Sequence, residues 1–133
     1  MTDWTQYLGN SLPIKSVYST VPSLTNVRLQ EIRLHQDGPR VSLRIDLNSF
    51  PENPPRKWIA AKFNRVQLTL LLIDISELYL RGWNLNNIGD LNFVASDARI
   101  AVAFDGESVK FECNARFVEV EKLSGYFDSY QAL

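Results

Sequence analysis

Apolar and polar residues alternate regularly over residues 66–72, and this pattern constrains the fold more than any other feature of the chain. Its apolar positions are Val66, Leu68, Leu70 and Leu72. A period of two is typical of a β-strand. From Leu71 to Ile73 the second face also turns apolar, which favours a central strand covered on both faces. A helix is the alternative, because apolar residues between 68 and 79 also fit an i, i+3, i+4 spacing.

The same alternation recurs through most of the chain, and this favours the strand. The other alternating segments are residues 26–35, 40–47, 78–81, 91–95, 100–104 and 109–120. Asp37-Gly38 and Asp105-Gly106 are hairpin-turn signals. The apolar phase slips near residues 30–31, where a β-bulge would reconcile the two parts, and again near residues 115–116. The sequence therefore predicts a mainly β protein, either an antiparallel β-sandwich or a strongly curved sheet, of about seven strands.

One short helix is predicted at the N-terminus. Trp4, Tyr7 and Leu8 share a helical face, Thr2 or Asp3 suits the N-cap, and Gly9 suits the end. Three prolines within residues 51–55 predict a rigid loop. With 133 residues, the chain has the size of one domain spanning 1–133.

Several features indicate a cytoplasmic protein. Cys113 is the single cysteine and has no internal disulfide partner, which fits a reducing compartment. The N-terminal residues do not have the pattern of a secretory signal. The longest aliphatic run, residues 70–73, is far shorter than the roughly 20 residues that span a bilayer, so no membrane partner is expected.

Charge is unevenly distributed along the chain. Residues 1–66 carry nine Lys/Arg and five Asp/Glu, a balance of +4, whereas residues 67–133 carry five and ten, a balance of −5. The acidic part suits either solvated strand faces or a patch that meets a basic partner. General nucleic-acid binding requires a positive stripe, so no nucleic-acid partner is expected.

No group of residues indicates a reaction. His35 is the only histidine, and a nucleophile would have to be brought to it by the fold. Cys113 has the parity of Val109 and Phe111, as a core residue would. One His, one Cys and scattered carboxylates do not supply a metal-ligand cluster, and no glycine-rich phosphate loop is present. We therefore expect no catalytic residues, no metal, no cofactor and no enzymatic activity.

A partner-facing surface is the more informative possibility, since Trp and Arg are common anchors of protein interfaces. Core or edge packing is the alternative role for the tryptophans. The partner-binding candidates are Arg56, Lys57, Trp58, Phe63, Trp83, Glu107, Glu112, Glu119 and Glu121.

Several phrases occur in an order that resembles the immunity protein 50 family of bacterial polymorphic toxin systems. They are VRLQEIRLH (27–35), GPR (38–40), LRIDL (43–47), PPRKW (54–58), FNRVQ (63–67), LYLRGW (78–83) and VEKLSGY (120–126). The resemblance covers roughly residues 4–126, and Trp58 and Trp83 match the family's tryptophan positions.

The resemblance implies a mostly β, non-enzymatic protein that binds a cognate toxin domain in the producing bacterial cell. Carboxylates that mimic a nucleic-acid backbone are one hypothesis for such binding. Two further hypotheses stay open. One is a small-ligand module whose pocket is lined by Trp58, Phe63, Tyr79 and Trp83. The other is an oligomerisation module, for example a homodimer formed through an exposed sheet edge.

Overall fold

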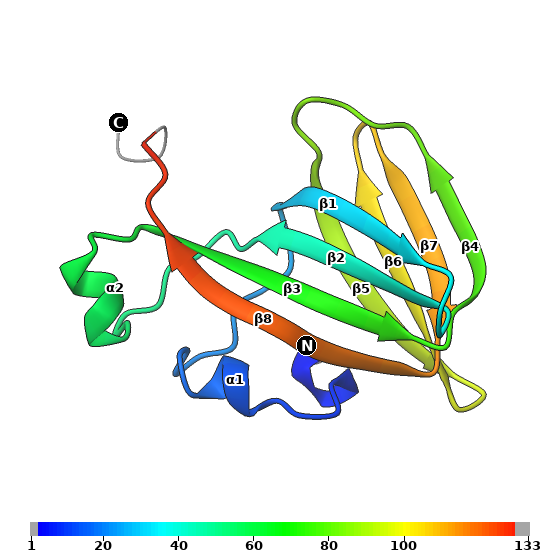
Figure 1. The fold of residues 1–133 in the computed structure, drawn as a ribbon, viewed down its shortest axis with the longest axis horizontal. Helices are drawn as coiled ribbons and strands as arrows, with labels where there is room; N and C mark the ends of the chain where they lie inside the picture. Colours follow the sequence, from blue (N-terminus) through cyan, green and yellow to red (C-terminus); the bar gives the residue numbers. More distant parts are fainter. Residues whose placement is uncertain (1–2, 130–133) are drawn as a thin grey trace.

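The chain forms one open antiparallel sheet of eight strands in the order β4-β7-β6-β5-β1-β2-β3-β8 (Figure 1). The computed structural model describes residues 3–129. The strands are β1 (Val27–His35), β2 (Arg40–Asp46), β3 (Arg65–Ile73), β4 (Ser76–Arg81), β5 (Ile88–Ser96), β6 (Arg99–Gly106), β7 (Lys110–Ala115) and β8 (Phe117–Tyr126). The predicted mainly β class is confirmed, as a strongly curved sheet.

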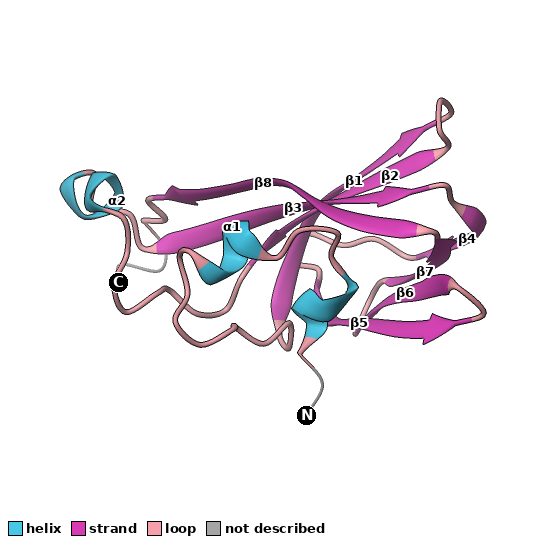
Figure 2. Ribbon diagram, turned by 90° about the horizontal axis from the view of Figure 1, so that it is seen from below, coloured by secondary structure: helices cyan, strands magenta, loops and turns pink. Residues whose placement is uncertain are grey.

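The sheet folds at the junction between β1 and β5. These strands pair only through Val27 with Gly89 and Arg28 with Ile88, whereas other neighbours pair along most of their length. The short junction divides the sheet into two four-stranded halves, β1-β2-β3-β8 and β5-β6-β7-β4. Figure 2 shows these halves as two layers, one above the other. Each strand therefore has an inner face toward the other half and an outer face away from it.

The hydrophobic core lies between the halves. Its largest fully buried side chains are Phe104, Phe111, Ile14, Leu29, Leu43, Ile45, Leu47, Leu68, Leu70, Leu72, Val27 and Val41. Alternation places the strand residues among them on the inner faces, because successive residues of a strand point to opposite sides, and Ile14 is contributed by α1 (Leu12–Lys15). Burial of this apolar surface is the main force holding the halves together.

Short helices cover the ends of the core. The 3₁₀-helix η1 (Trp4–Tyr7) and helix α1 (Leu12–Lys15) precede the sheet, and α2 (Arg56–Ala60) lies between β2 and β3. The predicted N-terminal helix is thus a single 3₁₀ turn, whose N-cap Asp3 accepts from the backbone N–H of Thr5 at 2.8 Å. No helix in residues 3–129 is long and apolar enough to cross a membrane.

The strand predicted over residues 66–72 is confirmed as β3, with two corrections. Strand β3 lies between β2 and β8, next to the edge strand rather than at the centre of the sheet. Its second face is half-buried rather than covered. Leu71 and Ile73 on that face oppose Glu119 and Phe117 of β8, so neighbouring side chains shelter them without a further layer.

The strand count of about seven was one too low, because residues 109–120 form two strands. The apolar phase slip near residue 116 is a boundary between β7 and β8, which lie toward opposite edges of the sheet. At this boundary the chain crosses from the half that contains β7 to the half that contains β8. There the backbone N–H of Arg116 already donates to the carbonyl of Ile73 on β3, at 2.9 Å. The slip near residues 30–31 is a true bulge, with a register shift between Leu29 and Glu31.

Candidate partner-binding surface

The fold converts the charge asymmetry of the sequence into two oppositely charged halves. Residues 27–73, which contain β1 to β3, carry eight Lys/Arg and four Asp/Glu, a balance of +4. Residues 76–115, which contain β4 to β7, carry three and six, a balance of −3. Strand β8 contributes −1 to the first group. We call β1-β2-β3-β8 the basic half and β5-β6-β7-β4 the acidic half.

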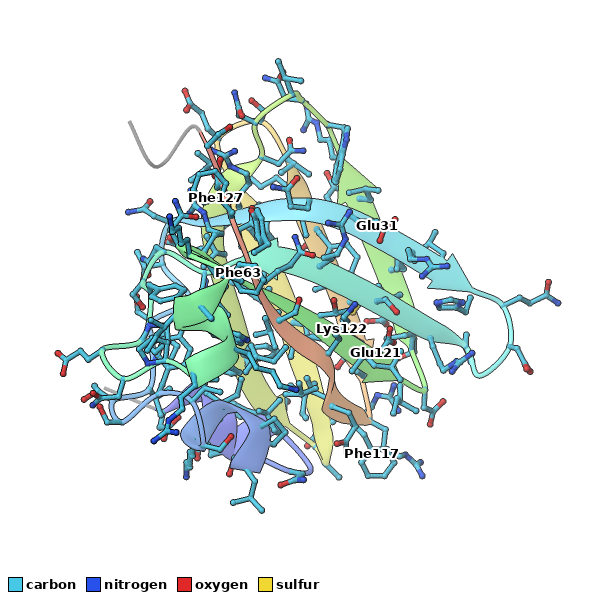
Figure 3. The ribbon with its side chains drawn as sticks, turned by 60° about the vertical axis from the view of Figure 1, so that its left-hand side comes forward. Glu31, Phe63, Phe117, Glu121, Lys122 and Phe127 are labelled. Atoms are coloured by element: carbon cyan, nitrogen blue, oxygen red, sulfur yellow. The ribbon has the colours of Figure 1, made fainter. Side chains whose placement is uncertain are left out.

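The four predicted glutamates do not form one patch. Glu107 and Glu112 belong to the acidic half, on the β6–β7 turn and on β7. Glu119 and Glu121 lie on β8 in the basic half. Figure 3 shows Glu121 beside Lys122, on the face where Glu31 also projects (Figure 3).

Trp58 and Phe63 hold α2 against the end of the sheet. The Trp58 ring lies 6.0 Å from that of Phe50, and Gly125 of β8 leaves room for both aromatic rings. A Cβ at residue 125 would lie 2.7 Å from Phe63 Cδ2 and 2.9 Å from Trp58 Cδ2. These two aromatic residues are half-buried, so packing is one of their roles.

Arg56 and Lys57 are exposed on α2, near one end of β8. Phe63 and Phe127 gather at this end, whereas Phe117 lies at the beginning of the strand. The α2 candidates are therefore grouped with the basic half.

Trp83 lies elsewhere, 51% exposed in the loop between β4 and β5. Tyr79 is on β4, the strand at the opposite edge of the sheet from β8. The surface hollows lined by Tyr79 include neither Trp58 nor Phe63. The four aromatic residues predicted to line one ligand pocket thus belong to two separate regions.

A hollowed surface lies on the outer face of the acidic half. Ala103 faces Asn92 on β5 and Glu112 on β7, and Glu112 faces Tyr79 on β4. The small side chains of Ala101 and Ala103 leave a depression between longer neighbours. Two adjoining hollows, of about 540 and 390 Å³, share Tyr79 and Glu112 as walls. We call this surface the alanine hollow.

The rim of the alanine hollow combines charged and apolar groups. Asp105 and Lys110 form an ion pair at the rim, near Arg81. Val94, on the outer face of β5, is 59% exposed. In the loop after β4, Trp83 and Leu85 are also exposed, at 51% and 92%, although neither lines the two hollows. Exposed apolar groups gathered within a charged surface are typical of protein-binding sites.

The surroundings of His35 do not suit nucleophilic catalysis. The fold brings Ser42 Oγ to 3.5 Å from His35 Nε2, but Ser42 is only 2% exposed. Its hydroxyl donates to Glu121 Oε1 at 3.3 Å, so the carboxylate contacts the serine and not the histidine. A triad needs the acid on the histidine. These contacts fit a polar link between β1, β2 and β8.

Cys113 is a core residue, as its parity predicted. It is buried on β7, and burial raises the pKa of its thiol to about 12, with the Arg99 guanidinium opposing this in part. A protonated, buried thiol is unreactive. Within residues 3–129 no group of three or more His, Cys, Asp or Glu side chains is placed to hold a metal.

One polar cluster was missed by the sequence reasoning. Asp46 lies on the outer parity of β2, yet it is only 2% exposed. Its carboxylate accepts hydrogen bonds from Gln30 at 2.6 Å, Gln67 at 3.0 Å and the Tyr126 hydroxyl at 2.8 Å. These donors come from β1, β3 and β8, so their convergence depends on strand order, which the local pattern does not reveal.

The fold and this surface define an all-β domain with exposed features that suit contact with another protein. A family model described as Immunity protein 50 matches residues 10–126, and the chain belongs to this family. The resemblance noted from the sequence is therefore confirmed. Comparisons with curated proteins and with solved structures gave no significant match.

Proposed function

We propose that this protein is a bacterial immunity protein that neutralises a cognate toxin by direct, non-covalent binding. Membership of the Immunity protein 50 family supports the general role. The observation that carries the binding mode is the alanine hollow, a depressed surface on the acidic half with Tyr79 at its wall and Trp83 exposed in the next loop. The protein would act stoichiometrically, in the cytoplasm of the cell that makes the toxin.

The chemistry of the hollow suits a basic anchor from the toxin. A Lys or Arg side chain entering above Ala101 would meet the Glu112 carboxylate and the Tyr79 ring, in the hollow whose other charged lining residue is Glu77. Paired charge and cation–π contact both favour such a side chain. The acidic balance of the half would also speed encounter with a basic active-site cleft. Binding there would cover the cleft and stop the toxin.

The first experiment is a co-expression assay with the toxic C-terminal domain encoded beside this protein's gene. Growth should be rescued, and the two proteins should co-purify as a stable complex. Rescue without a complex, or no rescue, would contradict direct neutralisation.

The two glutamate pairs provide a matched test of the surface. The double variant Glu107→Gln and Glu112→Gln should weaken toxin binding about tenfold and reduce its salt dependence, because opposite charges across an interface are screened by salt. The same change at Glu119 and Glu121 places identical chemistry on the basic half and should leave affinity nearly unchanged. The reverse result would place the toxin on β8 and refute the alanine hollow as the binding site.

Aromatic anchors commonly contribute more to binding than single charges. Trp83→Ala should therefore reduce affinity by about tenfold to a hundredfold. Lys57→Ala, an exposed residue on α2, is the control. Isothermal titration calorimetry with the purified toxin domain measures both, and an unaltered affinity for Trp83→Ala would exclude the loop from the interface.

A further inference from the structure

The two edges of the sheet differ in how far other segments of the chain cover them. At β8, Leu8 forms an isolated bridge with Val118, and the N–H of Gly9 donates to the Val118 carbonyl at 3.1 Å. The N-terminal segment thereby covers part of that edge. Strand β4 pairs only with β7, and no strand in residues 3–129 pairs with its other side.

The open edge is also apolar. All six residues of β4 are exposed, and its middle residues Leu78, Tyr79 and Leu80 are 42%, 47% and 45% exposed. Natural proteins usually protect a free edge with lysine, proline or charge in the middle of the strand, because unpaired backbone groups bind another strand. In β4 the charges stand only at the two sides of the apolar centre, as Glu77 and Arg81.

The sequence of this edge is complementary to itself when reversed. In an antiparallel pair with a two-fold axis at Tyr79, Glu77 of one copy faces Arg81 of the other, and Leu78 faces Leu80. The tyrosines meet at the axis. Each end of the strand pair then holds one Glu77–Arg81 pair of opposite charge, and the centre buries only apolar and aromatic side chains. We propose that β4 pairs with β4 of a second copy, forming a two-fold symmetric homodimer with a continuous sheet of both chains.

The local geometry supports part of this pairing. Tyr79, Leu80 and Arg81 are in regular register with Glu112, Phe111 and Lys110 of β7, so their other side is a regular strand edge. In the dimer this regular part faces residues 77–79 of the second copy. The register shift lies between Ser76 and Tyr79, where Glu77 has a φ of 55°. Glu77 therefore contributes through its long side chain rather than through ladder hydrogen bonds.

A two-fold axis perpendicular to the sheet keeps the outer faces of both copies on the same side. Tyr79 and Arg81 line the alanine hollow as well as the pairing edge, so the dimer contact borders the hollow. The pairing is testable on the protein alone, without the toxin.

Charge reversal provides the decisive test. Mass is measured by light scattering from about 5 to about 500 µM, because a single strand pair buries little surface and gives a weak dimer. The wild type should shift from monomer to dimer mass within this range. Glu77→Arg places like charges at both ends of the pair, and Arg81→Glu does the same with the opposite sign. Each should weaken dimerisation about tenfold or more.

Mixing these two single variants should restore the dimer. The Glu77→Arg chain carries a positive charge at both positions, and the Arg81→Glu chain carries a negative charge at both, so every facing pair is again of opposite sign. This outcome distinguishes strand pairing from loss of folding. A circular dichroism spectrum of each variant checks the fold. Failure of the mixture to associate, or a wild type that stays monomeric at the highest concentration, would overturn the proposal.

A cysteine scan tests the axis directly. Tyr79→Cys should crosslink to a second copy under mild oxidation, because directly opposed residues of antiparallel strands lie within disulfide distance. Arg81→Cys is the matched control, since its own counterpart lies far from the axis. Cys113 is buried and does not compete. Equal crosslinking at both positions would show non-specific contact and refute the register.

Discussion

The buried carboxylate of Asp46 makes a sharp stability prediction. Its three hydrogen-bond donors, Gln30, Gln67 and Tyr126, come from three other strands of the basic half. Asp46 is thus the point at which β1, β2, β3 and β8 are joined by side chains as well as by backbone. We consider the change Asp46→Ala, which removes the acceptor and leaves three donors without it.

The expected loss of folding stability in Asp46→Ala follows from these contacts. A hydrogen bond to a charged group contributes about 1.5–3 kcal/mol, so the three together contribute roughly 5–9 kcal/mol before opposing terms. Removing the carboxylate relieves its desolvation, which is several kcal/mol, and the half-buried donors regain some water. The net loss for Asp46→Ala is therefore expected to be about 3 kcal/mol. Tyr126→Phe removes one of the bonds and should cost about 1–1.5 kcal/mol.

Urea unfolding followed by circular dichroism measures these values through a double-mutant cycle. In the Asp46→Ala background the Tyr126 hydroxyl has already lost its acceptor, so Tyr126→Phe should cost almost nothing more. The coupling free energy between the two positions should be about 1 kcal/mol. Ser124→Ala, a nearby half-buried change on β8, is the control and should stay within about 0.5 kcal/mol. Additive losses at Asp46 and Tyr126 would refute the reasoning.

Two further predictions concern alkaline pH and the packing of α2. Burial raises the pKa of the Tyr18 hydroxyl, which donates to the Ser49 carbonyl at 2.7 Å. The unfolded chain loses this proton near pH 10 while the folded chain keeps it, so this group should lower stability above pH 10 by about 1.4 kcal/mol per pH unit. Tyr18→Phe should remove that part of the slope in urea titrations from about pH 9 to about pH 12, and an unchanged slope would contradict the assignment. Gly125→Ala should lower the free energy of unfolding by about 1–3 kcal/mol, because the added Cβ would overlap the Phe63 and Trp58 rings. The tryptophan emission maximum should shift as stability falls, because the Trp58 ring would have to move. Unchanged emission together with unchanged stability would show that α2 adapts freely.

Local pattern was sufficient to predict most strands. Alternation is a property of a few consecutive residues, so the segments that became β1, β2, β3, β5 and β6 were visible without any knowledge of their partners. The boundary at Arg116 was not visible, because inner residues on β7 and β8 continue with only a one-residue change of phase. Only the pairing of Phe117 with Ile73 of β3 shows that the chain has changed halves.

The same limit applies to the candidate surface. Glu112 and Glu119 are seven residues apart and look alike in the sequence, yet strand order places one in each half. Conversely, Tyr79 and Glu112 are far apart in the chain and form one wall. Charge composition left open whether the acidic residues form a patch or lie on solvated strand faces, and long-range pairing decides which carboxylates share a half of the sheet.

Two departures from ordinary sheet design fall on the same half of the molecule. Ala101 and Ala103 occupy outer-face positions where strands usually carry larger side chains, and β4 keeps an apolar edge without a covering element in residues 3–129. Neither feature improves the stability of the isolated domain, since one forgoes cross-strand packing and the other exposes apolar surface. Sites where sequence rules are broken without a structural gain are those where function is expected. Both features lie on the acidic half, whereas the N-terminal segment covers part of the opposite edge. This is the physical reason for proposing both a toxin contact and a dimer contact on the acidic half.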